Sequence, residues 1–219
     1  KNDFFVIDRY GTSATHAYRL TGDVALTTNV YFTSFRRHWW RQSSSSAQRP
    51  NDAADPTCGG MANLNTTCGN EGRLRQYYTW GAEPRLRVHH RLFAIASEAD
   101  LGVRLHFERQ DRRQENGDTP TARSGVLVER NLRLNQAYSA FAQNRFLIGG
   151  WTFTPGIRLE HVRFARTNRL ANAGAGATGT TELTQAIPGF GVSYTAGERV
   201  TVFGGVHRGF APPRTEDVI

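Results

Sequence analysis

Residues 73–88 read RLRQYYTWGAEPRLRV, and two kinds of side chain alternate along them. The even positions are mostly apolar or aromatic, as at Leu74, Tyr78 and Trp80, whereas the odd positions are mostly charged or small. A period of two is typical of a β-strand, whose successive side chains point to opposite faces. The stretch therefore predicts one long strand with an apolar face and a polar face.

The same alternation recurs along the chain and predicts an all-β protein. Eighteen residues in one strand extend roughly 60 Å at about 3.3 Å per residue. That reach exceeds a bilayer core of about 30 Å, and a soluble sandwich has no need of it. The strands are predicted at residues 4–20, 24–41, 73–93, 99–109, 125–146, 151–166, 182–195 and 200–209.

The connections between these strands fall into two classes. Short turns are expected at 21–23, 96–98, 149–150 and 196–198, and outer loops at about 42–72, 110–124, 167–181 and 210–219. Short turns at one end and long loops at the other are the pattern of outer-membrane barrels. Aromatic residues near the strand ends fit an interfacial girdle, with the core of a soluble β-sandwich as the alternative. We predict an antiparallel transmembrane β-barrel segment of about eight long strands.

Composition narrows the functional classes. The mean hydropathy is −0.52, and no run of 18 apolar residues predicts a transmembrane helix. The net charge of +8 comes almost wholly from arginine, since Lys1 is the only lysine. Arginine suits an acidic ligand or lipopolysaccharide phosphates, although arginine-rich codon usage explains the bias equally well. The arginines are spread along the chain rather than gathered in one stripe, so no nucleic-acid partner is expected.

Cys58 and Cys68 lie ten positions apart in a polar loop, without the spacing of a zinc site. We expect a disulfide, worth roughly 3 kcal/mol in the chain-entropy model, with two free thiols as the alternative. Such a bond indicates an extracytoplasmic location. No catalytic motif is present, and His89 and His90 would point to opposite faces of a strand, so we predict neither an enzyme nor a metal site.

Three stretches carry a family resemblance: CGGM at 58–61, WTFTPGIRLEH at 151–161 and FGGVHRGFAPP at 203–213. By these the chain resembles the TonB-dependent outer-membrane receptors. Through residues 8–10 and 80–85 it is most similar to the ferric dicitrate receptor family. The resemblance implies a barrel of about 22 strands, closed by an N-terminal plug that engages the TonB complex. Both ends of this chain look like cuts, so it would supply about eight strands of a longer parent.

The resemblance also implies a ligand and the residues that hold it. Receptors of the dicitrate family hold an anionic iron–citrate complex with arginines at the outer mouth, and no cofactor is expected besides this transported chelate. The matching positions are Arg37, Arg75 and Arg130, of which the first two have the parity of the polar face. Arg130 shares parity with leucines, so Arg133 is the alternative. Because outer loops decide ligand choice, the long loop at 42–72 leaves open which chelate is bound. A haem receptor that uses His38, or a passive porin, is the alternative.

Overall fold

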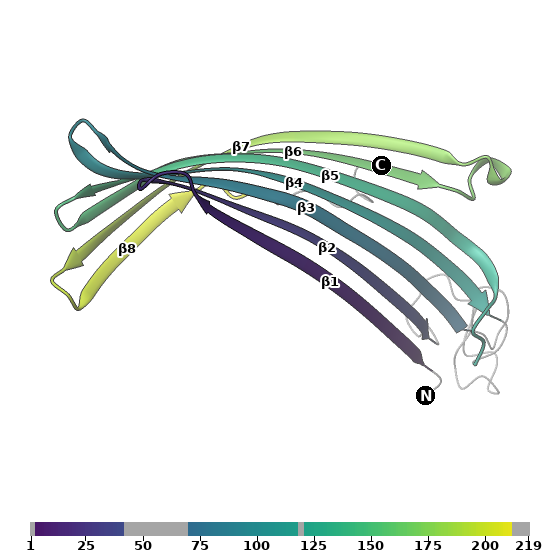
Figure 1. The fold of residues 1–219 in the computed structure, drawn as a ribbon. Coiled ribbons are helices and arrows are strands. Elements are labelled where there is room, and N and C mark those ends of the chain that lie inside the picture. The colour runs from purple at the N-terminus through teal and green to yellow at the C-terminus, as the bar shows by residue number, and fades with distance from the viewer. Residues whose placement is uncertain (1–2, 42–69, 118–120, 212–219) are drawn as a thin grey trace.

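A single curved antiparallel sheet makes up the computed structural model, which describes residues 3–41, 70–117 and 121–211. Its eight strands follow one another in sequence order, and each pairs with the next (Figure 1). The strands are β1 (Phe4–Arg19), β2 (Val24–Arg41), β3 (Asn70–Leu92), β4 (Ile95–Gly117), β5 (Val126–Ile148), β6 (Trp151–Asn168), β7 (Ala177–Ala196) and β8 (Val200–His207). The predicted all-β class is confirmed.

The two ends of the sheet differ as the sequence predicted. At the turn end, short connections at 20–23, 93–94, 149–150 and 197–199 join the strands. At the loop end, β6 and β7 are joined by residues 169–176, which include a short 3-10 helix at Asn172–Gly174. The predicted loops are shorter than expected at 167–181, where strand extends to Asn168 and resumes at Ala177. Most of the predicted 42–72 loop lies outside the described residues, and so do 118–120 and 212–219.

Strand β4 is much longer than the predicted 99–109, because both of its expected boundaries were wrong. The turn lies at Phe93-Ala94 rather than at 96–98, and both of its residues have positive φ, 51° and 64°. A two-residue hairpin turn of this kind favours Asn and Gly, neither of which is present. At the other end, residues 110–117 are polar on both faces, so alternation could not reveal that the strand continues.

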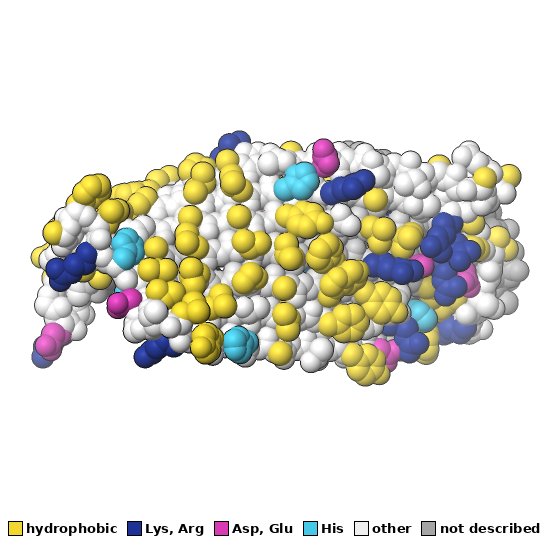
Figure 2. Space-filling view, turned by 45° about the horizontal axis from the view of Figure 1, so that its top comes forward, with side chains coloured by type: hydrophobic (Ala, Val, Ile, Leu, Met, Phe, Trp, Pro, Cys, Tyr) yellow, Lys and Arg dark blue, Asp and Glu magenta, His cyan; other side chains and the backbone are white. Residues whose placement is uncertain are grey.

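The pairing register gives the sheet two chemically different faces. One face is convex and carries rows of apolar side chains, seen in yellow in Figure 2. Register partners such as Phe32, Trp80 and Phe107 lie side by side on it. The concave face carries the polar set, to which Arg37, Arg75 and Arg112 belong. The alternation of residues 73–88 thus corresponds to the two faces of β3.

In residues 3–41, 70–117 and 121–211, no second layer packs on the sheet to bury its apolar residues. Among the described residues, the large apolar side chains that are buried are Trp40, Leu74, Val162 and Phe164. Many others are exposed on the convex face, including Val30, Leu101, Leu105 and Ile157. No helix in the described part of the chain is long and apolar enough to cross a membrane. A wall with an exposed apolar outer face suits contact with lipid rather than with water.

The turn at Phe93-Ala94 gives a first prediction. Because a non-glycine residue at positive φ is strained, Ala94→Gly should stabilise the protein by about 0.5–1 kcal/mol. Urea unfolding in detergent would measure this change. Ala96→Gly, a substitution inside β4, serves as the control and should destabilise the protein. A loss of stability in the Ala94→Gly variant would contradict the turn geometry.

Candidate ligand-binding site on the concave face

Arginines from three neighbouring strands lie in one row at the loop end of the concave face. Arg37 on β2 is the register partner of Arg75 on β3, and Arg75 is the partner of Arg112 on β4. The row continues on β5 with Asn131, the partner of Arg112. Side chains at paired positions of an antiparallel sheet have Cβ atoms about 5 Å apart, so the guanidinium groups share one small region.

A second pair of arginines lies beside this row. Arg133 on β5 is the register partner of Arg166 on β6, and both belong to the same concave face. Arg166 Nε lies 3.4 Å from Asn131 Oδ1, which links the pair to the row. We call Arg37, Arg75, Arg112, Arg133 and Arg166 the arginine cluster.

Glu129 supplies the negative charge nearest the centre of the arginine cluster. Its Oε1 atom lies 3.7 Å from Arg75 Nη1 and 3.5 Å from Arg112 Nε. The same oxygen accepts a hydrogen bond from Asn131 Nδ2 at 2.9 Å. Among the described residues, one carboxylate thus stands between two guanidinium groups of the cluster.

The cluster is partly withdrawn from solvent. The relative exposure is 5% for Arg75 and 7% for Arg133. Arg37 Nε and Arg75 Nη1 are buried donors, and within the described ranges neither has a hydrogen-bond acceptor. A buried donor without an acceptor is unfavourable, so an added anion at this position would be stabilised.

Aromatic side chains flank the cluster on the concave face. Phe35 and Tyr77 pair across β2 and β3, with ring centroids 5.5 Å apart. Nearer the loop end, the Trp39 ring contacts Phe5 edge-on, and the Arg41 guanidinium lies 4.6 Å from the Trp39 centroid. The loop end of this face therefore combines cationic donors with rigid aromatic surfaces.

The structure brings together only some of the residues that the sequence singled out. Arg37, Arg75 and Arg133 share the concave face, as their parity predicted. Arg130 is the register partner of Arg113 and lies with Leu132 and Leu134 on the convex face. A bulge where Gln114 meets Glu115 lies beyond this pair and does not turn Arg130 inward. Cys58 and Cys68 lie outside the described residues.

Sequence reasoning missed Arg112, Arg166 and Glu129. Their parity marks them as concave, but only the pairing register places them beside Arg75 and Arg133. Arg112 fell in the predicted 110–124 loop, which hid its place on a strand.

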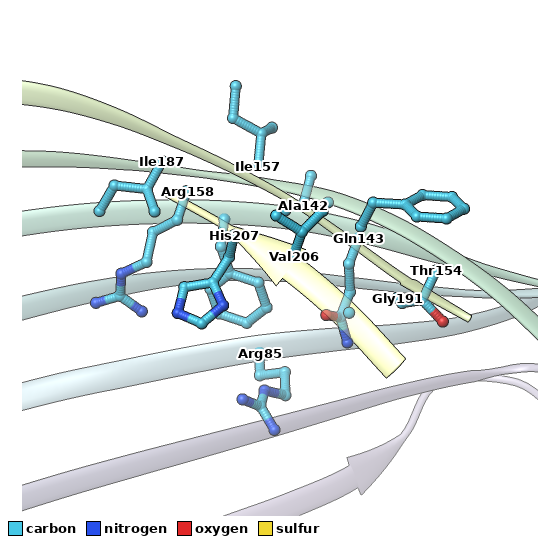
Figure 3. Close-up of a pocket in the computed structure, with 15 residues that line it drawn as sticks. Arg85, Ala142, Gln143, Thr154, Ile157, Arg158, Ile187, Gly191, Val206 and His207 are labelled. Carbon is cyan, nitrogen blue, oxygen red and sulfur yellow. The ribbon is translucent and has the colours of Figure 1, made fainter. Parts of the chain in front are cut away.

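A pocket of about 540 Å³ lies nearer the turn end of the concave face. Figure 3 shows Arg85, Arg158 and His207 pointing into it from β3, β6 and β8, while Ile157 points to the opposite side. The paired Gly156 and Gly189 lack side chains and leave the space open. The pocket is cationic, but it contains none of the arginine cluster.

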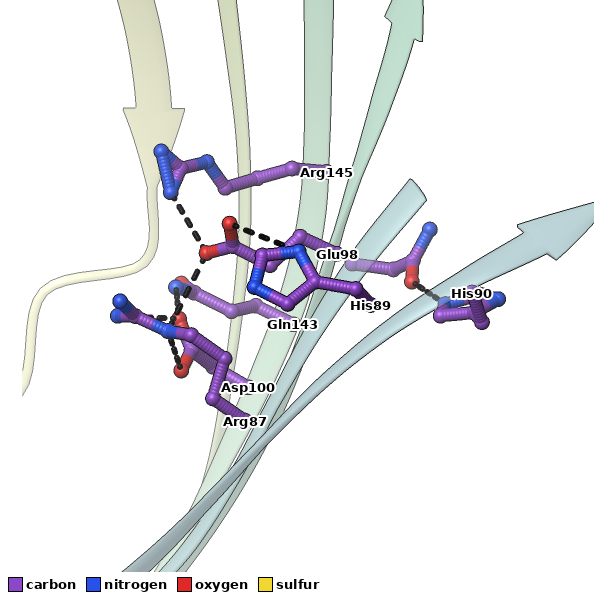
Figure 4. Close-up of polar contacts among 8 residues, drawn as sticks. Arg87, His89, His90, Glu98, Asp100, Gln143 and Arg145 are labelled. Carbon is purple, nitrogen blue, oxygen red and sulfur yellow. Dashed lines mark hydrogen bonds and ion pairs between the residues drawn. The ribbon is translucent and has the colours of Figure 1, made fainter. Parts of the chain in front are cut away.

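A charged network occupies the concave face close to the turn end (Figure 4). Arg87 Nε lies 3.2 Å from Asp100 Oδ1 and 3.3 Å from Glu98 Oε1. Arg145 donates to Glu98 at 2.9 Å, and Gln143 Nε2 donates to the buried Asp100 at 3.3 Å. The network therefore links the side chains of β3, β4 and β5 near the turn end of the concave face.

The adjacent histidines lie on opposite faces of β3. His89 Nδ1 lies 3.8 Å from Glu98 on the concave face, whereas His90 Nε2 lies 2.7 Å from Asn144 Oδ1 (Figure 4). The two rings thus have separate partners, as the strand geometry predicted. Within the described residues, no group of three or more His, Cys, Asp or Glu side chains could hold a metal ion.

A curved antiparallel sheet with an apolar convex face, a polar concave face, and short turns at one end defines a segment of a transmembrane β-barrel wall. The chain belongs to the family described as TonB dependent receptor-like, beta-barrel, whose model matches residues 1–219. No curated protein matches the chain.

Several solved structures share the fold. The ferric citrate transporter FecA in its unliganded form is 17% identical, with a TM-score of 0.73 over 94% of this chain and 28% of FecA. The siderophore receptor PiuA from Acinetobacter baumannii is 11% identical, with a TM-score of 0.66 over 93% of this chain and 32% of that receptor. The ferric-catecholate import receptor Fiu from E. coli K12 is 12% identical, with a TM-score of 0.63 over 96% of this chain and 36% of Fiu. The chain spans about a third of the length of these proteins or less.

The network of Figure 4 gives a prediction about stability. Arg87→Ala leaves the buried Asp100 without its main ion-pair partner, but the Arg87 side chain is itself 45% exposed, so the change should destabilise the full-length receptor by only about 1 kcal/mol. Arg87→Ala combined with Asp100→Asn should be more stable than Arg87→Ala alone, because the uncompensated charge is gone. Urea unfolding in detergent would measure both. Equal stability of the two variants would show that the pair does not stabilise the wall.

Proposed function

We propose that this chain is part of an outer-membrane receptor that takes up a ferric chelate, ferric citrate or another carboxylate siderophore, and that it is not an enzyme. The parent would draw on the TonB complex through a part outside this chain. This chain would supply eight strands of its barrel wall over residues 1–219, with outer loops at the loop end. Family membership supports the receptor class. The arginine cluster is the observation that favours an anionic ligand.

The chemistry of the cluster fits a carboxylate-rich ligand. A guanidinium group offers a planar pair of donors that matches the two oxygens of a carboxylate. Arg37 and Arg75 hold buried donors that lack hydrogen-bond acceptors in the described part of the chain. A citrate carboxylate between β2 and β3 would accept from both arginines, and Arg133 on β5 would serve a second carboxylate of the same complex.

Position supports the same proposal. The cluster lies at the loop end, which faces outward in outer-membrane barrels, and on the concave face, which lines the lumen. The Cys58–Cys68 disulfide would close a loop that begins after β2, at the same end. A ligand arriving from outside would therefore meet the cluster before the deeper pocket around Arg85 and Arg158.

A haem receptor is the less favoured alternative. It would require an axial histidine in the lumen, and His38 shares the convex face with Arg36 and Arg113 instead. FecA is described as a ferric citrate transporter, whereas PiuA and Fiu are described as siderophore and ferric-catecholate receptors. The arginine cluster favours the carboxylate ligand among these classes.

Substitution of the three arginines tests the ligand site. In the full-length receptor, Arg37→Gln, Arg75→Gln and Arg133→Gln together should weaken ferric citrate binding more than about tenfold, because several charge-assisted hydrogen bonds are lost. Tryptophan quenching in detergent, with ferric hydroxamate and haem as comparison ligands, would measure the affinity.

A charge-matched control removes three arginines elsewhere: Arg36→Gln, Arg163→Gln and Arg199→Gln. Arg36 and Arg163 lie on the convex face and Arg199 in a turn, so ferric citrate affinity should stay within about twofold of the unmodified receptor. Unchanged affinity in the first triple variant would refute the assigned site. Equal losses in both variants would indicate a general effect of net charge.

Glu129 provides a test of opposite sign. Because its carboxylate competes with an anionic ligand for Arg75 and Arg112, Glu129→Gln should tighten ferric citrate binding by about threefold to tenfold. The same titration measures the change, and the gain should shrink as the salt concentration rises. Weaker binding would mean that Glu129 positions the arginines rather than competing with the ligand.

A further inference from the structure

A recess lies deep on the concave face, where glycines take the place of larger side chains. The pocket of about 540 Å³ in Figure 3 has a volume within the range of about 300–1,000 Å³ that is usual for small-molecule sites. A smaller hollow of about 270 Å³ shares Arg85, Phe141 and Arg158 with it. We call the two hollows together the deep recess. Part of its surface on β6, β7 and β8 is formed by four glycines of the concave face, Gly156, Gly189, Gly191 and Gly205.

Arg85 is held in position inside the deep recess by an aromatic ring. Gly102 is the register partner of Arg85 on one side and of Phe141 on the other. A Cβ atom at position 102 would lie 2.3 Å from the Phe141 ring, so glycine leaves room for this ring above β4. The Arg85 guanidinium lies 5.3 Å from the ring centroid, a distance at which a cation–π interaction orients the arginine. The guanidinium is therefore preorganised for binding.

Arg85 differs from the charged groups around it, because it forms no ion pair among the described residues. On its loop-end side, Arg104 Nε lies 2.9 Å from Glu83 Oε1. On its turn-end side, Arg87 pairs with Asp100. An exposed guanidinium without a carboxylate partner, in a hollow of the wall, attracts an anion.

Arg158 on β6 adds a second cationic group. It is the register partner of Phe141, so the ring lies between two arginines in one row of the sheet. Arg158 donates through Nε to Glu160, and its Nη atoms have no hydrogen-bond partner in the described part of the chain. Both guanidinium groups point into the recess in Figure 3. The recess therefore offers two separate groups that can each bind a carboxylate.

The deep recess is separate from the arginine cluster. Arg85 follows Arg75 by ten positions on β3, which corresponds to about 33 Å along the strand. One small chelate cannot contact both arginines at this separation. Because both lie on the concave face, a ligand that leaves the cluster toward the turn end would reach the recess further along the same wall.

We propose that the deep recess is a second, transient site for the anionic chelate on its way inward, and that Arg85 and Arg158 bind its carboxylates there. The recess offers two guanidinium groups where the cluster offers five, so it would hold the chelate more weakly and release it more readily. The inference rests on the proposed function, because it takes the ligand to be a carboxylate chelate that passes through the lumen.

Two measurements on the full-length receptor separate the two sites. Ferric citrate affinity, read by tryptophan quenching in detergent, reports the arginine cluster. The uptake rate of radioactive ferric citrate, by cells in which this receptor is the only route for it, also reports the passage inward. Arg85→Gln combined with Arg158→Gln should lower the maximal uptake rate more than about fivefold and change the affinity less than about twofold.

The matched control for charge is Arg163→Gln combined with Arg199→Gln. This variant loses the same two positive charges on the convex face and in a turn, and both measurements should match the unmodified receptor.

Filling the recess is a second test that leaves every charge in place. Gly191→Leu would add a side chain inside the recess, at a position where a Cβ atom meets no listed neighbour closer than 3.8 Å. Uptake should slow severalfold at unchanged affinity, because the chelate loses space. Gly204→Leu on the convex face, where a Cβ atom meets nothing within 4 Å, is the control and should leave both measurements unchanged.

Unchanged uptake in both recess variants would overturn the proposal. A parallel loss of affinity would also overturn it, because these residues would then belong to the first site. Entry of an antibiotic too large to pass the unmodified receptor would mean that the variants open the barrel, and would overturn the proposal in the same way. If the unmodified receptor bound no ferric citrate, the proposed function itself would fail, and the titration would show this before any variant is compared.

Discussion

Backbone hydrogen bonding between neighbouring strands is the interaction on which this wall depends. As far as the structure describes the chain, the single sheet has no opposing layer, and few of its large apolar side chains are buried. Each strand from β2 to β7 forms backbone hydrogen bonds along both edges, whereas β1 and β8 pair along one edge within the described residues. In a lipid environment an open edge is costly, so such a sheet is stable as part of a closed barrel. The long strands follow from the same constraint, because a ladder must span the apolar layer without interruption.

The strand pairing also determines which face of the sheet each side chain points to. Because each residue points to the face opposite its neighbours, one strand serves two environments at once. On β4, Arg112 belongs to the concave arginine cluster, whereas Arg113 lies on the convex face. On β5, Arg133 and Arg130 are divided in the same way. Adjacent positions on one strand thus carry side chains to opposite faces, where the sheet keeps the two sets apart.

Much of the fold could be predicted from alternation alone, and its failures have definite physical causes. The strand over residues 24–41 was found to the residue, because apolar and polar positions alternate along most of it. The turn at Phe93-Ala94 was missed because two residues without turn preference adopt positive φ there. The extension of β4 to Gly117 was missed because both faces are polar beyond the apolar rows.

For the site, parity alone placed Arg37 and Arg75 on the polar face and marked Arg133 as the alternative to Arg130. It could not show which residues share a height on the sheet. The grouping of Arg112 with Arg75, and of Arg166 with Arg133, depends on the pairing register, which no single strand encodes. Glu129 was missed for the same reason, although it stands closest to the centre of the cluster.

The division of Arg130 and Arg133 between two faces has a consequence for how such receptors can evolve. Deleting one residue from β5 between the bulge and the turn would shift one part of the strand against the other by a single position. Leucines would enter the lumen and charged groups would meet lipid at the same moment. Length changes are therefore accommodated in the connections between strands, or within a strand where a bulge absorbs the extra residue, as where Gln114 meets Glu115. Elsewhere along a strand, exchange of one residue for another is the change that leaves both faces intact.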